Sequence, residues 1–193
     1  MRAGDMKPGV RALGIAESYR AERNQSTLAG AIVRADRVVD GLAYGTCTVG
    51  GFDATDAIVS VLDRLCRPDV RYVLVGAIAP AWYNLLSLSE IAEAIDRPVI
   101  AVTFEESDGL EAGIRDAFSG EERRQRLEQY RSLPDRRELS VNDETVYVRA
   151  CGLEDDAAAE VVRGFTPEGG RPEPIRVARL AARATDEYVD ADE

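Results

Sequence analysis

The chain contains no histidine, and this absence restricts the chemistry that its side chains could perform. It excludes a Ser-His-Asp triad, a Cys-His dyad and every zinc centre with a histidine ligand. Catalysis would have to use carboxylates, hydroxyls, thiols, the lone lysine Lys7 or a metal ion held by carboxylates. Cys47, Cys66 and Cys151 are far apart and form no C-x-x-C pair, so we expect buried thiols rather than disulfides or a zinc site.

Two short segments carry residues that could contact a ligand. Gly50 and Gly51 precede a predicted helix, whose N-terminus could bind a phosphate, although an ordinary turn is the favoured interpretation. Trp82, Tyr83 and Asn84 follow a predicted central strand, where mixed sheets place ligand sites. They could stack on a base and hydrogen-bond its edge, while core packing or a dimer contact accounts for them equally well. We expect this second segment to recognise the substrate.

A charged segment mixes arginines with glutamates, and we interpret it as a solvated, ion-paired helix face. Its residues are Glu121, Glu122, Arg123, Arg124, Arg126, Glu128 and Arg131.

The composition is strongly acidic, with 35 acidic and 24 basic residues. Carboxylate-rich, lysine-poor surfaces stay hydrated in concentrated salt, where charges are screened within about 3 Å at 1 M. The composition therefore predicts a halophilic protein, and its net charge does not exclude DNA as a partner. The length predicts one domain over residues 1–193. Because no apolar run suits a membrane helix or a secretory signal, we expect a cytoplasmic protein without a membrane partner.

Strands are predicted first along the chain, over residues 10–15, 27–34 and 37–49, the last broken near Gly41. The short connection Ala35-Asp36 makes the second and third strands antiparallel neighbours. A helix follows Asp53, because apolar residues recur at helical spacing. It covers residues 54–65.

Buried strands are predicted over 72–78 and 98–104, with a helix capped by Ser87 or Ser89 between them, so this pair should be parallel. The pattern predicts an α/β fold with a ribonuclease H-like mixed sheet, in which three antiparallel strands precede parallel strands and helices flank the sheet. The remaining expectations are helices around 110–118 and over 154–163 and 174–187, a hairpin around 142–144, and a disordered acidic tail over 186–193.

Five segments, in order and spacing, resemble the archaeal endonuclease dU family. They are residues 7–15 (KPGVRALGI), 51–55 (GFDAT), 77–84 (AIAPAWYN), 97–102 (RPVIAV) and 172–178 (PEPIRVA). The family resembles endonuclease V, whose fold is ribonuclease H-like and which cuts nucleic acid beside deaminated bases with a divalent metal held by carboxylates. The resemblance therefore implies a metal-dependent endonuclease acting on DNA that contains deoxyuridine, with Mg²⁺ or Mn²⁺ as cofactor.

The chain departs from the family pattern at several acidic positions. Ala16, Gly76 and Ser87 stand where the resemblance leads us to expect acids. Glu17 and Asp53 remain, and the resemblance makes them the candidate catalytic residues and metal ligands. An N-cap role for Asp53 and a solvated surface role for Glu17 are the alternatives.

Asp56 or Glu90 could replace a lost ligand. The resemblance also makes Arg34 and Arg176 candidate contacts to a phosphate backbone, unless nearby carboxylates pair with them. The leading hypothesis is an endonuclease dU-like enzyme. The alternative is a catalytically degenerate paralogue that binds nucleic acid or another subunit, and either could form a homo-oligomer. A third hypothesis is a phosphate-binding module that uses the Gly50-Gly51 loop.

Overall fold

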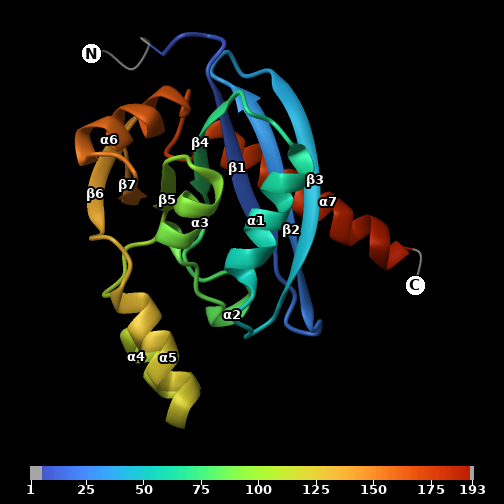
Figure 1. Ribbon diagram of the computed structural model, residues 1–193, viewed down its shortest axis with the longest axis vertical. Helices are drawn as coiled ribbons and strands as arrows, with labels where there is room; N and C mark the ends of the chain where they lie inside the picture. Colours follow the sequence, from blue (N-terminus) through green and yellow to red (C-terminus); the bar gives the residue numbers. More distant parts are fainter. Residues whose placement is uncertain (1–5, 192–193) are drawn as a thin grey trace.

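The computed structural model describes residues 6–191, and a mixed seven-stranded sheet forms its centre (Figure 1). The strand order is β3-β2-β1-β4-β5-β7-β6. The strands are β1 Arg11–Ser18, β2 Gln25–Arg34, β3 Val39–Thr48, β4 Val70–Val75, β5 Val99–Thr103, β6 Arg137–Val141 and β7 Glu144–Cys151.

The strand directions agree with the predicted mixed sheet. β1, β2 and β3 are antiparallel to one another in turn, whereas β4 runs parallel to β1 and β5 runs parallel to β4. The hairpin of β6 and β7 joins β5 through antiparallel pairing. The β2–β3 register shifts between Ile32 and Val33, opposite Gly41 and Val39, where a break in the third strand was expected.

Helices cover both faces of the sheet (Figure 1). They are α1 Ala54–Leu65, α2 Pro80–Tyr83, α3 Leu88–Ile95, α4 Glu111–Ala117, α5 Gly120–Arg131, α6 Asp155–Gly164 and α7 Glu173–Ala191. Apolar residues of α1 and α3 share one core cluster with the sheet, and those of α6 and the start of α7 share another. Within residues 6–191, no helix combines the length and apolar character needed to cross a membrane.

Helix α7 packs directly against β1, and Gly14 makes this approach possible. A Cβ atom at Gly14 would lie 2.1 Å from the carbonyl carbon of Pro174, far inside van der Waals contact. The absence of a side chain at this position therefore lets the start of α7 lie on the backbone of β1.

The expectation of a disordered tail over 186–193 is wrong for the part that the structure describes. Helix α7 continues to Ala191. Asp186 is buried and accepts a hydrogen bond of 2.5 Å from the Thr27 hydroxyl, and Arg20 lies 3.7 Å from its carboxylate. These contacts tie the acidic segment to β2. Residues 192–193 lie outside the described range.

The thiols differ in their surroundings. Cys47 is buried in β3, and all three cysteines are free. The expectation of burial is wrong for Cys66, which ends α1 at the surface in a left-handed conformation with φ 46°.

Candidate functional site

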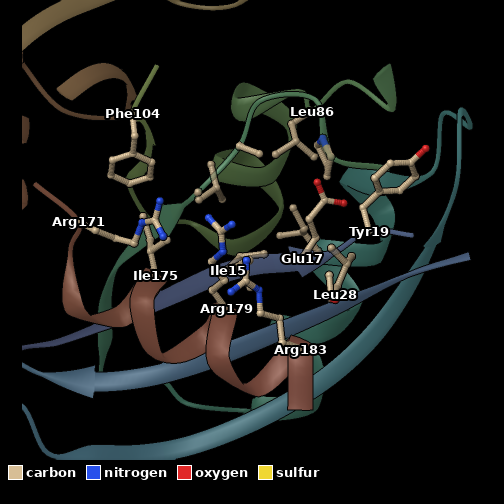
Figure 2. A pocket seen from close by; sticks show the side chains of 17 residues that line it. Ile15, Glu17, Tyr19, Leu28, Leu86, Phe104, Arg171, Ile175, Arg179 and Arg183 are labelled. Carbon is tan, nitrogen blue, oxygen red and sulfur yellow. The ribbon is translucent and has the colours of Figure 1, made fainter. Parts of the chain in front are cut away.

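A pocket of about 280 Å³ lies between the carboxyl ends of β1 and β4 and one side of α7 (Figure 2). Because β1 and β4 are parallel neighbours, their carboxyl ends meet at one edge of the sheet. Ala16 and Gly76, two positions where the resemblance led us to expect acids, line this pocket together with Glu17.

Glu17 is the one acidic residue that lines the pocket within the described chain. Its Oε2 accepts hydrogen bonds from the backbone N–H of Ala81 at 2.6 Å and from the Ser26 hydroxyl at 2.9 Å. Burial raises the pKa of Glu17, and these hydrogen bonds together with the charge of Arg179 offset only part of that effect. Glu17 is thus a partly buried pocket residue rather than a solvated surface acid.

Asp53 has a different role, because its carboxylate is occupied by neighbouring loops. It accepts hydrogen bonds from the Thr48 hydroxyl at 2.7 Å, the Thr48 backbone N–H at 3.0 Å and the Asn84 side-chain amide at 2.7 Å. Burial alone would raise the pKa of Asp53, but these hydrogen bonds outweigh it and lower the pKa. Asp53 occupies the N-cap position of α1 without capping it, since the Ala54 N–H donates to Asn84 Oδ1 at 3.0 Å.

The four-residue segment α2, which follows β4, does not have the backbone of a regular right-handed helix. Ala81, Trp82 and Tyr83 all lie in the left-handed region, with φ of 48°, 57° and 61°. Each such non-glycine residue costs roughly 1–2 kcal/mol, so other contacts must hold the turn. Glu17 accepts from the Ala81 N–H, and the Gly50 N–H donates to the Ala81 carbonyl at 2.7 Å.

The three residues predicted to recognise a substrate separate into two environments. Tyr83 packs in a cluster with Leu85 and Ile114, and Asn84 is fully buried. Trp82 is 47% exposed, the most exposed of the three, and one part of its ring packs against Phe118 at a centroid distance of 5.0 Å.

Arg126 corrects the expectation of a wholly solvated α5. Its neighbour Arg124 is exposed and paired with Glu121 at 2.5 Å, as expected. Arg126 is only 1% exposed, and its guanidinium lies 4.0 Å from the Phe52 ring centroid and 3.8 Å from that of Phe118. It donates to the carbonyl of Tyr83 at 3.2 Å and to the carbonyl of Gly50. Burial lowers the pKa of Arg126.

The Gly50-Gly51 loop does not present free donors to a phosphate. The Gly50 N–H donates to Ala81, and the Gly51 N–H donates to the Thr48 carbonyl at 3.0 Å. A Cβ at Gly50 would lie 2.9 Å from the Trp82 ring, so the glycine lets Trp82 lie against this loop.

Arg34 and Arg176 are both paired with carboxylates close to them in the chain. Arg34 lies 2.5 Å from Asp36, and Arg176 makes a two-pronged contact with Glu173 at 2.5 and 2.6 Å. Neither arginine lines the pocket.

Three arginines that the sequence patterns did not single out do line the pocket. Arg171 precedes α7, and Arg179 and Arg183 lie four residues apart on it (Figure 2). Their side chains point into the same space as Glu17. Among the described residues, no carboxylate lies within 4.0 Å of any of the three. The i, i+4 spacing of Arg179 and Arg183 is the sequence signal that could have identified them.

The family model for endonuclease dU matches residues 8–185. The chain belongs to the endonuclease dU family. It is similar to a UPF0215 protein from Pyrobaculum calidifontis, with 32% identity over 179 residues that cover 92% of this chain and 97% of that protein. The predicted resemblance is therefore confirmed.

Solved structures confirm the predicted ribonuclease H-like fold for this family member. It is similar to a protein of unknown function from Archaeoglobus fulgidus, with a TM-score of 0.80, 23% identity and coverage of 91% of this chain and 98% of that one. It is also similar to endonuclease V from Ciona intestinalis, solved with a 24mer DNA containing an inosine followed by a ribo-adenosine. That match has a TM-score of 0.64, 14% identity and coverage of 93% and 87%. Family and fold together suggest a nuclease.

The residues present in this family member do not fit the divalent metal that the resemblance implies. Within residues 6–191, no group of three or more His, Cys, Asp or Glu side chains could hold a metal ion. Mg²⁺ requires about six oxygen ligands, and the pocket offers one carboxylate opposed by arginines. Asp56 and Glu90 do not line the pocket.

Gly76 lies too close to α7 to carry a side chain without rearrangement. A Cβ there would lie 2.8 Å from Cγ2 of Ile175 in α7, so even the first side-chain atom would force Ile175 to move. At this position, where the resemblance led us to expect an acid, α7 packs against the sheet.

Proposed function

We propose that this protein binds nucleic acid at the pocket edge of its sheet and has lost metal-dependent hydrolysis. The proposal rests on the charges that line the pocket. One carboxylate, Glu17, shares it with three arginines, Arg171, Arg179 and Arg183. None of these arginines pairs with a carboxylate among the described residues. Positive side chains oppose a dication and attract the phosphate of a nucleic acid. This is the degenerate-paralogue hypothesis, with nucleic acid as the partner.

Two exposed aromatic residues support the same function. Tyr19 lines the pocket and is 42% exposed, and Trp82, which is 47% exposed, follows the lining residue Pro80 by two positions in the chain. Aromatic rings stack on bases without regard to sequence, and each base contributes roughly 1–3 kcal/mol. A strand could therefore place a phosphate among the arginines and a base on Trp82.

The test of hydrolysis uses a labelled duplex that carries one deoxyuridine, the substrate that family membership suggests. The duplex is incubated in potassium chloride with Mg²⁺ or Mn²⁺, and binding and nicking are measured in the same samples. We expect binding without metal-dependent nicking. Nicking that is abolished by both Glu17→Gln and Asp53→Ala would establish an active nuclease and refute the proposal.

The test of binding compares Arg179→Gln with Arg124→Gln. The second variant removes an exposed arginine of α5 that does not line the pocket. If Arg179 contacts a phosphate, the slope of log affinity against log salt should fall by about one in Arg179→Gln. Arg124→Gln should leave the slope unchanged. Equal slopes in both variants would place the bound strand elsewhere.

The test of stacking uses Trp82, the only tryptophan in the sequence. Binding of a single strand should quench its fluorescence, and Trp82→Ala should weaken binding by roughly 1–3 kcal/mol. Unchanged emission during saturable binding would exclude Trp82 from the interface.

A further inference from the structure

We propose that the pocket binds a phosphomonoester, with Arg171, Arg179 and Arg183 as its ligands. The source is either the terminal phosphate of a nucleic acid strand or a free nucleoside monophosphate. The strand end rests on the function proposed above, whereas the free nucleotide does not.

Among the described residues, the pocket arginines lack the carboxylate partners that other arginines of the chain have. Arg124, Arg131 and Arg176 each lie within 3.0 Å of a glutamate oxygen. The pocket arginines have no ion pair and no side-chain hydrogen bond among the described residues, in a sequence with 35 acidic residues against 24 basic ones. An acidic protein that leaves three guanidinium groups unpaired in one cavity has arranged them for an anion from outside.

In contrast to the exposed Arg183, Arg171 is half-buried. Its Nε is buried without a hydrogen-bond partner, and its guanidinium lies 4.3 Å from the Phe104 ring centroid. Burial lowers the pKa of Arg171, repulsion from Arg179 and Arg183 lowers it further, and the charge of Glu144 offsets only part of this. A buried donor without an acceptor carries a desolvation cost, which a bound phosphate oxygen would remove.

The three arginines reach the pocket from two segments of the chain. Arg179 and Arg183 are four residues apart on α7 and so share one helix face, while Arg171 approaches from the segment before the helix (Figure 2). Guanidinium groups from two directions can bind different oxygens of one phosphate. Leu28, Ile58 and Leu86 form an apolar part of the wall. The volume of about 280 Å³ leaves room for more than a phosphate group alone.

The charge of the pocket matches that of a phosphomonoester. Among the lining residues the charged side chains are the three arginines and Glu17, so the pocket carries a net charge of at least +2. A phosphomonoester has about -1.5 to -2 charges at neutral pH and three terminal oxygens. An internal phosphodiester has one charge and two free oxygens. The pocket therefore suits a phosphate at an end better than one within a strand.

The first arm of the test uses free nucleotides and isothermal titration calorimetry. Adenosine monophosphate and uridine monophosphate should bind with similar affinity, and adenosine without phosphate should bind at least about tenfold more weakly. Arg171→Gln and Arg179→Gln should each lose about tenfold or more, as expected for hydrogen bonds between charged groups. Arg176→Gln is the matched control on α7, because Arg176 is paired with Glu173 outside the pocket. Circular dichroism checks that each variant is folded.

The second arm uses short single strands of one sequence with a 5′-phosphate, a 3′-phosphate or hydroxyls at both ends. A strand with one phosphorylated end should bind at least about ten times more tightly than the hydroxyl strand. This preference should disappear when a pocket arginine is replaced. Monophosphate binding without any end preference would support the pocket, assign it to free nucleotides and count against the proposed strand binding there. Strand binding that ignores both the end phosphate and Arg171→Gln, with no monophosphate binding, would overturn the phosphomonoester site and leave nucleic-acid binding standing.

Discussion

Replacing Arg126 with alanine should destabilise the protein and loosen the turn that carries Trp82. Arg126 reaches from α5 into the body of the molecule and holds the carbonyls of Gly50 and Tyr83. Its guanidinium is stacked between the rings of Phe52 and Phe118. Truncation would remove both contacts at once and leave two backbone acceptors facing a cavity.

The expected size follows from these contacts. A hydrogen bond from a charged donor contributes roughly 1.5–3 kcal/mol, and a desolvated cation–π contact contributes about 2 kcal/mol. Desolvation of the guanidinium offsets part of the gain, since Nη1 is buried without a hydrogen bond and lies 4.0 Å from Glu122. We expect a net loss of about 3 kcal/mol in the free energy of unfolding, which for a chain of this length lowers Tm by roughly 6–12 °C.

The assay is denaturant and thermal unfolding, followed by circular dichroism and by the fluorescence of Trp82. Arg124→Ala is the control, because Arg124 is exposed on the same helix and its loss should change stability by less than about 0.5 kcal/mol. Arg126→Met keeps apolar contact with the two rings and should lose less than Arg126→Ala. If Arg126→Ala matched Arg124→Ala, the guanidinium would not hold the turn.

Three further predictions test other parts of the fold. Gly14→Ala should lower the free energy of unfolding by about 3 kcal/mol or prevent folding, because the new methyl group meets the backbone of Pro174. Gly9→Ala is the control and should be neutral, since nothing lies within 4 Å of a Cβ there. Equal denaturation midpoints for the two variants would contradict this prediction. Asn84→Ala should lower the free energy of unfolding by about 3 kcal/mol, because the buried amide both donates and accepts hydrogen bonds that alanine cannot make. A loss below about 1 kcal/mol in denaturant unfolding would show that water replaces the amide. Glu17 has a raised folded-state pKa, so the protonated form favours folding below its ordinary pKa of 4.5 and this contribution is lost as pH rises through the folded pKa. Glu17→Gln should therefore gain stability relative to the wild type across that rise, and parallel pH curves for the two proteins would contradict the assigned burial effect.

Much of the fold could be predicted because it depends on local periodicity. The helix over 54–65 and the apolar runs that became β4 and β5 are patterns of a few consecutive residues, and the structure places them within a few positions of the predicted bounds. Asp186 shows where such reasoning stops. Its acidic segment suggests disorder, but a hydrogen bond to Thr27 on a distant strand keeps it helical.

The site was harder to predict because its residues are brought together only by tertiary packing. Glu17 was named because a resemblance directed attention to the end of β1. Arg179 and Arg183 were missed because charged residues on a helix face are usually solvated, and Arg171 was missed because it lies in a loop before that helix. The three line one cavity only because α7 packs against the sheet. Arg126 was misassigned for the same reason: glutamates beside it in sequence do not reveal the two rings that enclose it in space.

The pocket joins the end of β1 to α7, so two segments from opposite halves of the polypeptide must meet before it exists. During synthesis on the ribosome, β1 would emerge early and present Glu17 without its arginines. A nascent chain could form its first hairpins and still have no affinity for phosphate. Ligand binding would thus appear late and all at once, which makes it a sensitive reporter of whether the entire polypeptide has folded.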